Sequence, residues 1–497
     1  MLSQNEVGEV QDPERRLTPD RIAFPQQLEL GVRSIGTPRD WIYLRMQSCK
    51  ILVPTGMLGS GCPKEAIERG FSMQPAAVAV DAGSTDSGPY FLATTHSKMT
   101  RGAVRRDLAQ IIPRQLEAGI PLIIGSCGSA GTDAGVDYVA DICNEILSEI
   151  GRTARIAKIY SEIQASDLIE RLARGRVSPL TPSGPLTAED IQNCTRIVGL
   201  QGPETMQKAI RDGAQIILCG RATDTAVLSC LPLMQGLPAG ASWHAAKIAE
   251  CGSVCTERLR LGGVMIEVHP DGFDVEPLHI DNRCTVASVS AHMLYENSDP
   301  FRLIEPGVVL DASEARYEQL DTRRVRVTGS RAETTNYTIK LEAARLAGYQ
   351  TISFVCIREP KVLERFEDWL QSLKEACFSW IQENLKFSSD DYEIDFRPYG
   401  WNGLGGNWPP NGGVPFEVGL MVLVTAATSE RSLQIARACN PALLHWSGDP
   451  AAPMPSFAFP FSPAETPRGP VYEFAMNHVV SVDDPLELFR FEYSGDE

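Results

Sequence analysis

Residues 78–90 read Val78-Ala79-Val80-Asp81-Ala82-Gly83-Ser84-Thr85-Asp86-Ser87-Gly88-Pro89-Tyr90, and this stretch decides how the rest of the chain is interpreted. The short apolar run 76–80 ends here in a segment of carboxylates, hydroxyl side chains and glycines. Such a change is typical of a buried parallel strand whose C-terminal end opens into a binding loop.

Two further segments repeat this pattern. Leu122-Ile123-Ile124 runs into a glycine- and serine-rich segment, 125–131, and the apolar run 216–219 runs into Gly220-Arg221-Ala222-Thr223-Asp224. Because the carboxyl ends of parallel strands lie at the same edge of a sheet, we expect the three loops to lie together. This edge is the predicted active site.

Strands alternate with helical patterns from about residue 48 to residue 260, which predicts an α/β fold with a doubly wound, mostly parallel sheet. About six strands are expected between residues 50 and 220, so a barrel, which needs eight, is the second choice. After residue 260 the alternation ends, and an α+β arrangement is expected. The predicted domains are an N-terminal extension (1–46), the α/β domain with Gly/Asp-rich loops (47–260) and an α+β domain with a Pro-rich C-terminal segment (261–497).

The composition narrows the range of partners and compartments. The 497 residues carry a formal net charge of -17, and this argues against a nucleic-acid partner, which requires a basic face. No apolar run approaches the roughly 20 residues of a membrane helix, and residues 1–11 have no signal-peptide core. The thirteen cysteines are scattered without a disulfide or zinc framework, which is typical of reduced thiols. We therefore expect a cytoplasmic protein with no membrane partner.

Asp81 and Asp86, with Ser84 and Thr85 between them, form the first candidate catalytic group. The two carboxylates suit a Mg²⁺ ion, an acid–base pair or hydrogen bonds to a polyol. The alternative is a purely local role as a helix cap or Asx turn.

The segment 125–131 is a candidate anion-binding loop. Its backbone N–H groups precede a helix and are suited to a carboxylate or phosphate. The residues predicted to bind the anion there are Gly125, Ser126, Gly128 and Ser129. The pattern matches neither G-x-G-x-x-G nor a Walker A loop, and a tight strand-to-helix turn is the alternative.

Two further groups complete the predicted site. Arg221 is suited to bind a carboxylate or phosphate in bidentate fashion beside Asp224, and an ion pair between the two is the alternative. His244 and Lys247 lie one helical turn apart, with Glu250 three residues further on, so they are expected to share a helix face. A histidine there is a candidate proton shuttle, although a structural role is commoner.

The segment 400–408, Gly400-Trp401-Asn402-Gly403-Leu404-Gly405-Gly406-Asn407-Trp408, is rich in glycine and aromatic residues. Loops of this composition serve as lids or subunit contacts. The alternative is an irregular surface loop. We expect the protein to form a homo-oligomer.

Eight blocks of the chain, in order, resemble the acyclic terpene utilisation protein A (AtuA) family over roughly residues 48–427. The blocks are TGMLGSG (55–61), AVAVDAGSTDSGPY (77–90), LIIGSCGSAGTD (122–133), IILCGRATD (216–224), WHAAKIAECG (243–252), RCTVASVSAHMLYENSDPFRLIEPG (283–307), YTIKLEAARLAGYQTIS (337–353) and RPYGWNG (397–403). The resemblance implies breakdown of branched acyclic terpenoids through acyl-CoA intermediates, and it supplies no catalytic residue. Many members of this family are followed by, or paired with, a small ferredoxin-like domain, and for this chain we expect that domain to be either supplied by a separate subunit or absent.

The first function hypothesis is an enzyme that transfers protons on a small branched carboxylate or its CoA thioester, as a hydratase or dehydratase, an isomerase or a lyase. CoA then enters as part of the substrate, and Mg²⁺ at Asp81 and Asp86 is the candidate cofactor. One alternative is an ATP-dependent phosphotransferase, because Asp81-Ala82-Gly83-Ser84-Thr85 resembles the phosphate loop of the actin and sugar-kinase group. The other alternative is a non-catalytic subunit of an acyl-CoA-processing complex.

Overall fold

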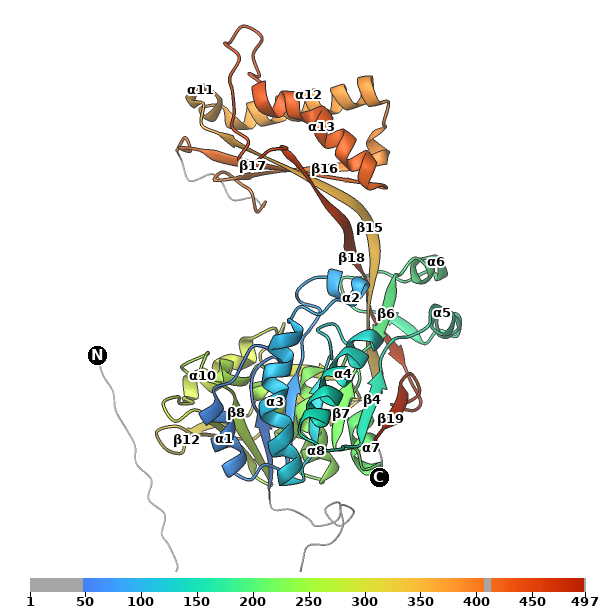
Figure 1. Cartoon of the computed structure of the whole chain (residues 1–497), viewed down its shortest axis with the longest axis vertical. Coiled ribbons are helices and arrows are strands. Elements are labelled where there is room, and N and C mark those ends of the chain that lie inside the picture. Colours follow the sequence, from blue (N-terminus) through green and yellow to red (C-terminus); the bar gives the residue numbers. More distant parts are fainter. Residues whose placement is uncertain (1–47, 406–412, 496–497) are drawn as a thin grey trace, which may run out of the picture. The chain divides into compact units, whose positions relative to one another are not determined.

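The structure of the chain is a computed structural model that describes residues 48–405 and 413–495 (Figure 1). The predicted N-terminal extension and part of the segment 400–408 lie outside the described residues. The N-terminal extension at 1–46 and the lid or subunit contact at 400–408 therefore stay predictions.

A ten-stranded mixed sheet forms the larger part of the fold. Its strand order is β12-β13-β9-β8-β1-β2-β3-β7-β4-β19. The five central strands are parallel to one another and are β1 (Cys49–Val53), β2 (Ala77–Asp81), β3 (Leu122–Gly125), β7 (Ile216–Cys219) and β4 (Ile156–Tyr160). The outer strands pair antiparallel and are β8 (Val264–His269), β9 (Gly272–Pro277), β12 (Arg316–Gln319), β13 (Val325–Thr328) and β19 (Arg490–Ser494).

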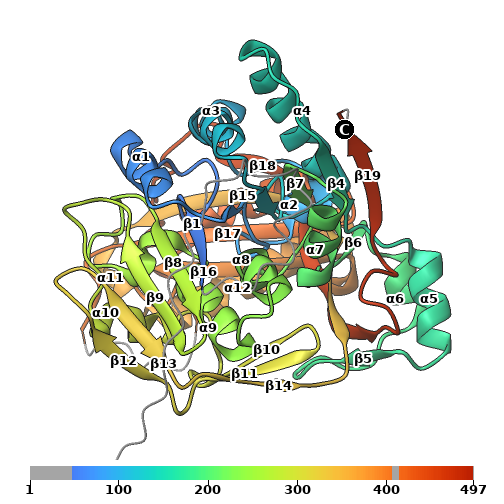
Figure 2. The same cartoon turned by 90° about the horizontal axis from the view of Figure 1, so that it is seen from below.

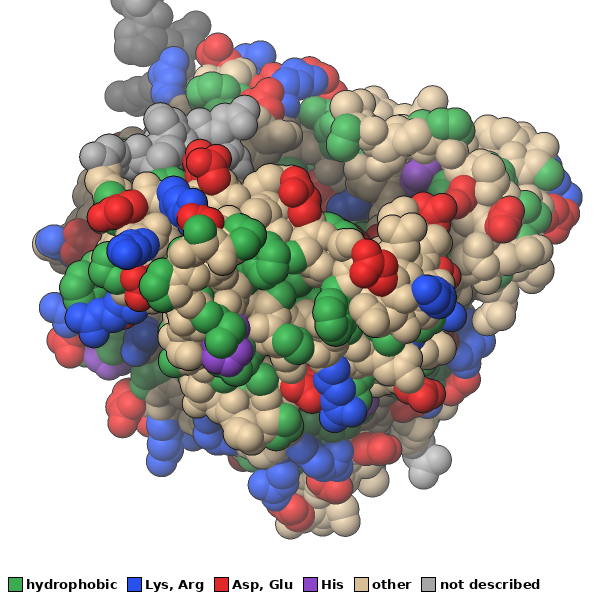
Figure 3. All heavy atoms as spheres, turned by 90° about the horizontal axis from the view of Figure 1, so that it is seen from above, with side chains coloured by type: hydrophobic (Ala, Val, Ile, Leu, Met, Phe, Trp, Pro, Cys, Tyr) green, Lys and Arg blue, Asp and Glu red, His purple; other side chains and the backbone are tan. Residues whose placement is uncertain are grey.

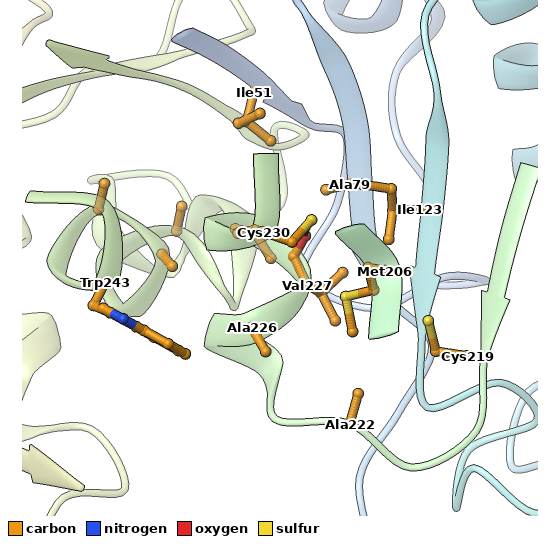
Figure 4. Close-up of a cluster of buried hydrophobic side chains, with 14 of the residues drawn as sticks. Ile51, Ala79, Ile123, Met206, Cys219, Ala222, Ala226, Val227, Cys230 and Trp243 are labelled. Atoms are coloured by element: carbon orange, nitrogen blue, oxygen red, sulfur yellow. Dashed lines mark hydrogen bonds between the residues drawn. The ribbon is translucent and has the colours of Figure 1, made fainter. Parts of the chain in front are cut away.

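Helices cover both faces of this sheet. Successive residues of a strand point to opposite faces, and the central strands carry apolar residues on both, so both faces need to be covered. Val78 and Val80 pack with α1 (Lys64–Ser72), α3 (Arg101–Ala118) and α4 (Asp133–Glu149) (Figure 2). Ala77 and Ala79 pack on the other face, against α7 (Pro203–Arg211), α8 (Asp224–Met234) and α9 (Ala239–Ala249). Figure 4 shows part of this second cluster, where Ala79, Ile123, Val227 and Cys230 lie between the strands and α8. The central strands are thus buried on both sides.

Two of the helices begin at the carboxyl edge of the parallel strands. The Thr132 side chain accepts a hydrogen bond from the N–H of Gly135 and caps α4, and Thr223 does the same for α8 through Ala226. Such threonine caps satisfy N–H groups that have no partner within the helix. The loops between strand and cap are therefore short and fixed at both ends.

A six-stranded sheet, β16-β17-β15-β18-β5 with β6 beside β15, carries the later part of the chain. Its longest strand, β15 (Thr338–Ile357), pairs with β6 (Arg196–Gly199), β18 (Glu465–Ser481) and β17 (Val418–Ala426). The others are β16 (Tyr392–Tyr399) and β5 (Val177–Pro179). Helices α12 (Phe366–Leu385) and α13 (Ser429–His445) pack on it through a separate apolar cluster that contains Trp369 and Leu443.

The remaining elements are short. They are α2 (Tyr90–Thr94), α5 (Ala165–Ala173), α6 (Ala188–Gln192), η2 (Gly252–Cys255), α10 (Val286–Ala291), η3 (His292–Leu294), α11 (Pro360–Leu363), η4 (Ser389–Asp391) and the three-stranded sheet β10 (Arg302–Glu305), β11 (Val308–Asp311) and β14 (Arg331–Thr334). On the face drawn in Figure 3, hydrophobic, acidic and basic side chains are interspersed.

The fold confirms the prediction of mixed helices and sheets with a large sheet that is parallel at its centre. Within residues 48–405 and 413–495 no sheet closes into a barrel. The finer description as a doubly wound sheet stays a prediction, and so do the three domain ranges. Any division near residue 260 must accommodate the pairing of β8 with β1 in the same sheet. Among these residues, no helix combines the length and apolar character that a membrane-crossing segment requires.

Candidate active site

The loops that follow β2, β3 and β7 meet at one edge of the ten-stranded sheet, as the parallel strands predicted. The N–H of Ala82 donates to the carbonyl of Gly125 (2.9 Å), and the N–H of Ser126 donates to that of Gly220 (3.1 Å). The N–H of Arg221 in turn donates to the carbonyl of Gly131 (2.9 Å). These backbone contacts hold the three loops against one another.

Two glycines permit this close approach. A Cβ on Gly83 (φ +143°) would lie 2.6 Å from Ser129 Cα, and a Cβ on Gly131 (φ +63°) would lie 2.2 Å from the backbone nitrogen of Arg221. Any larger residue would have to push a neighbouring loop away. The glycines at these two positions therefore serve loop packing.

Asp81, at the end of β2, is the central side chain of the site. The residue is 5% exposed, and its Oδ2 accepts a hydrogen bond from the N–H of Gly83 (2.7 Å). Its Oδ1 lies against Gly125, is buried, and makes no hydrogen bond. Burial, reinforced by the charge of Asp224, raises the pKa of Asp81 well above its usual range, although Arg221, the Gly83 N–H and the nearby Ser126 hydroxyl oppose this shift. The environment of Asp81 therefore favours the protonated carboxyl over the charged carboxylate.

Asp224 is the first residue of α8 and the second predicted carboxylate that the structure brings to this edge. One of its oxygens lies 3.7 Å from Nη1 of Arg221. Burial raises its pKa to about 6 even though 27% of the side chain is exposed; Arg221 lowers this pKa, while Asp86 and Glu296 raise it further. Asp81 and Asp224 therefore influence each other's protonation.

Arg221 makes a buried ion pair with Glu342 of β15. Its Nε lies 3.0 Å from Glu342 Oε2, and Nη1 donates to Ser126 Oγ (3.0 Å) and to the carbonyl of Ala222 (3.1 Å). The hydroxyl of Thr85 also donates to Glu342 (3.0 Å), and the pKa of Glu342 is lowered because Arg221 outweighs its burial. Most donors of Arg221 are thus used within the protein, so the guanidinium positions the loops around Asp81.

A second group of ionisable side chains adjoins the first. Lys247 and Glu250 on α9 do lie on one face, with Nζ 2.5 Å from Oε1, and both side chains are at most 6% exposed. Burial raises the pKa of Glu250 to about 8 and that of Glu305, at the end of β10, to about 7, while Lys247 opposes both shifts. Charge interactions of Lys247 and of Glu305 with Asp224 connect this group to Asp81.

The structure places the other predicted residues less centrally. Asp86 is exposed, and its Oδ2 accepts a hydrogen bond from Ser84 Oγ (2.6 Å). Ser129 Oγ accepts the N–H of Lys98 (2.8 Å). Gly128 packs against Gly135, and the N–H of Ser126 is used for the Gly220 contact. The anion-binding role of this loop, and a Mg²⁺ ion shared by Asp81 and Asp86, stay predictions.

His244 is fully buried and makes its contacts elsewhere. Its Nδ1 lies 2.7 Å from Ser330 Oγ, its Nε2 lies 3.1 Å from the hydroxyl of Tyr317, and its ring packs edge-on against Phe273. Burial lowers its pKa to about 3, so the ring is neutral. These contacts join His244 to Ser330, Tyr317 and Phe273 rather than to Asp81, so its catalytic role stays a prediction and we leave it out of the proposed catalytic group.

The fold and the site define an α/β protein with a group of buried, coupled acids at the carboxyl edge of its parallel strands. The sequence model of the acyclic terpene utilisation family protein AtuA matches residues 94–449, and the chain therefore belongs to this family. The predicted family is confirmed over residues 94–449, whereas the blocks 55–61 and 77–90 lie outside the matched residues. Searches of curated proteins and of solved structures gave no significant match.

Proposed function

We propose that the protein is an enzyme that transfers protons on a small branched carboxylate or its CoA thioester, as a hydratase or dehydratase, an isomerase or a lyase. The observation that carries this proposal is the buried Oδ1 of Asp81, which has no hydrogen-bond partner. An unpaired buried carboxyl costs stability, and such costs concentrate at functional sites.

Asp81 and Asp224 have the properties of an acid–base pair. General acids and bases work best when their pKa values lie near the working pH, and two coupled carboxyls whose environments differ divide these roles. The pKa of Asp224 is about 6, and that of Asp81 is raised well above its usual range. We assign the acid role to Asp81 and the base role to Asp224. Glu342 and Arg221 hold the surrounding loops in place.

The substrate class rests on the family and on two nearby cations. The family is named for the utilisation of acyclic terpenes, and the resemblance to it implies branched acyl-CoA intermediates. Lys98, whose Nζ donates to Ser87 Oγ (2.7 Å), and Lys340, whose Nζ lies 3.5 Å from Glu342 Oε1, are exposed beside the Asp81 loop. These two lysines are suited to bind the carboxylate or the CoA phosphates of such a substrate.

The first test identifies the ligand class. The purified chain is screened by thermal shift against branched acyl-CoAs, small carboxylates, free CoA and ATP with Mg²⁺. A ligand at a hundredfold excess over its Kd stabilises the native state by about 2.7 kcal/mol. A shift with an acyl-CoA or carboxylate supports the proposal, and a shift with ATP alone contradicts it.

The second test measures proton transfer directly. The ligand that gave a shift is incubated with the protein in D₂O, and deuterium incorporation or turnover is followed by mass spectrometry. We expect Asp81→Asn to slow the reaction by about 10²–10⁴-fold without loss of folding. The matched control is Asp141→Asn, an exposed aspartate of α4, which should react like the unmodified protein. Equal rates for Asp81→Asn and Asp141→Asn would refute the proposal and favour a non-catalytic subunit.

A further inference from the structure

Three side chains near the C-terminal end of α9 offer a nitrogen, a sulfur and an oxygen to one point. Glu250 and Cys251 follow each other at the end of the helix, and His292 begins η3. The ligand atoms of the three residues all lie within 4.8 Å of one another, and Glu250 Oε1 is 4.0 Å from His292 Nε2. Ligands around one metal ion, with bonds of about 2.0–2.3 Å, are about 3.3–3.8 Å apart, so small side-chain rotations bring these atoms to bonding distance.

The histidine is the observation that points to a ligand. His292 is 3% exposed, and neither of its ring nitrogens makes a hydrogen bond. Its ring stacks on Tyr295 with centroids 5.4 Å apart, which fixes the ring plane. Burial lowers the pKa of His292, and the backbone of Lys247 opposes this shift as a weak hydrogen-bond partner of the imidazole, short of the geometry of a full hydrogen bond. In metal sites the second ring nitrogen of a ligating histidine commonly faces such a carbonyl.

The surrounding charge also calls for a cation. Asp224, Glu250 and Glu305 interact with one another, and two buried cations, Lys247 and Arg221, lie beside them. Arg221 is already paired with Glu342, so these two cations face four buried carboxyl groups, and buried carboxylates require compensation. The ammonium of Lys247 contacts Glu250 Oε1, the oxygen that also lies 4.0 Å from His292 Nε2, so a bound metal ion shares this oxygen with Lys247 or uses Oε2.

The backbone that carries Cys251 is rigidly held. A Cβ on Gly56 would lie 2.5 Å from the Cys251 carbonyl oxygen, and a Cβ on Gly252 (φ +58°) would lie 2.5 Å from the Gly56 nitrogen. The two segments are therefore in direct backbone contact. Ligands on a fixed backbone lose little conformational entropy when they bind.

We propose that Glu250, Cys251 and His292 bind a divalent transition-metal ion with the ligand preferences of zinc. Thiolate, imidazole and carboxylate together suit Zn²⁺ and exclude Mg²⁺ or Ca²⁺, which take oxygen ligands. Three protein ligands leave a fourth position for water or for a substrate oxygen, as in catalytic zinc sites. The site is distinct from the Mg²⁺ site predicted at Asp81 and Asp86, and the inference does not depend on the proposed reaction.

The test uses Co²⁺ as a spectroscopic probe in the full-length protein. The purified chain is treated with a chelator, dialysed and titrated with Co²⁺. We expect a thiolate-to-cobalt charge-transfer band that saturates at one equivalent and disappears when Zn²⁺ is added. Cys251→Ser removes the band, and Cys356→Ser, which changes an exposed thiol, keeps it.

Either of two results would overturn the inference. One is the absence of the band in the unmodified protein, and the other is its persistence in Cys251→Ser. The first result is decisive even if Cys251→Ser fails to fold. His292→Asn provides an independent variant, in which the Co²⁺ affinity should fall at least about tenfold. Because no substrate is needed, failure here leaves the proton-transfer proposal to its own test.

Discussion

The buried carboxyl groups of the six-stranded sheet and of the candidate site differ in whether their oxygens have hydrogen-bond partners. In the six-stranded sheet Glu465 is 8% exposed and fully paired, with Arg437 Nε at 2.6 Å and Asn440 Nδ2 at 2.9 Å. The hydrogen bond from Arg437 lowers its pKa. At the candidate site, Asp81 Oδ1 in the ten-stranded sheet and Glu305 Oε2 in the three-stranded sheet are buried without a hydrogen bond, and the pKa values of both residues are raised.

This difference shows which part of the fold is less stable than it could be. A buried polar group with a hydrogen-bond partner contributes to the stability of the native state, whereas a buried group without one reduces that stability. Glu465 therefore belongs to the architecture of its sheet. Asp81 and Glu305 lower the stability of the candidate site, and a function at this site explains why the fold tolerates them.

The largest effect on stability is expected at the buried pair that borders the unpaired acids. Glu342→Ala removes the closest ion-pair partner of Arg221, whose side chain is 8% exposed, and leaves the buried guanidinium with Asp224, 3.7 Å away, as its ion-pair partner. We expect a loss of about 3–5 kcal/mol in the free energy of unfolding, measured by urea denaturation. The matched change is Glu473→Ala in β18 of the same six-stranded sheet, whose partner Arg345 is 39% exposed. It should cost no more than about 1 kcal/mol, and equal losses would show that burial at the site does not strengthen the ion pair.

A somewhat smaller loss is expected when the loops at the site are forced apart. Gly131→Ala places a Cβ 2.2 Å from the Arg221 nitrogen at φ +63°, so strain and overpacking add to about 3 kcal/mol. The control in the six-stranded sheet is Gly469→Ala (φ +90°), where no atom lies within 4 Å of the new Cβ. Only backbone strain of about 1–2 kcal/mol is expected there. Thermal or urea unfolding distinguishes the two, and a smaller loss for Gly131→Ala would show that the loops can separate freely.

Much of the parallel core could be predicted because buried parallel strands are short apolar runs bounded by loops. The strands at 77–81, 122–125 and 216–219 were recognised in this way. The residues of a strand do not determine which other strand it pairs with. Thus β6 lies in sequence among the strands of the parallel sheet, but it pairs antiparallel with β15. Strand β15 is continuous although register shifts around Gly348 interrupt its alternation, so its length does not follow from the sequence pattern.

The candidate site likewise contains residues that the sequence predicted and residues that it did not. Asp81, Arg221 and Asp224 were predicted because they directly follow apolar strands. Glu342 and Glu305 were missed, because no local pattern distinguishes a strand glutamate that turns inward from one that faces solvent. His244 was chosen for its spacing from Lys247, which fixes a helix face but not what that face contacts. An excess of buried acids appears only when distant segments are brought together.

The pH dependence of stability should reveal the unpaired acid. The pKa of Glu305 is raised by burial to about 7 in the folded protein, against about 4.5 when exposed. The folded state then binds the proton more tightly, so stability falls as the pH rises between these values and stays low above them. Glu305→Gln removes this penalty, and we expect it to stabilise the protein by about 2–3 kcal/mol at pH 8 and to have little effect at pH 4. Urea denaturation at both pH values measures this, and a loss of stability at pH 8 would contradict the assignment.

The smallest effect, with the opposite sign, is expected from the paired acid. The pKa of Glu465 is lowered in the folded protein, so its contribution is present at neutral pH and is lost as the pH falls through the folded pKa. Glu465→Gln should therefore destabilise the protein at pH 7 by no more than about 1 kcal/mol, because the side chain of Arg437 is 61% exposed and solvent screens the pair. Near pH 3 the variant and the unmodified protein should be equally stable. If Glu465→Gln instead stabilised the protein at pH 7, an acid outside the site would also be unfavourable in its charged form. Destabilising buried acids would then no longer distinguish the candidate site.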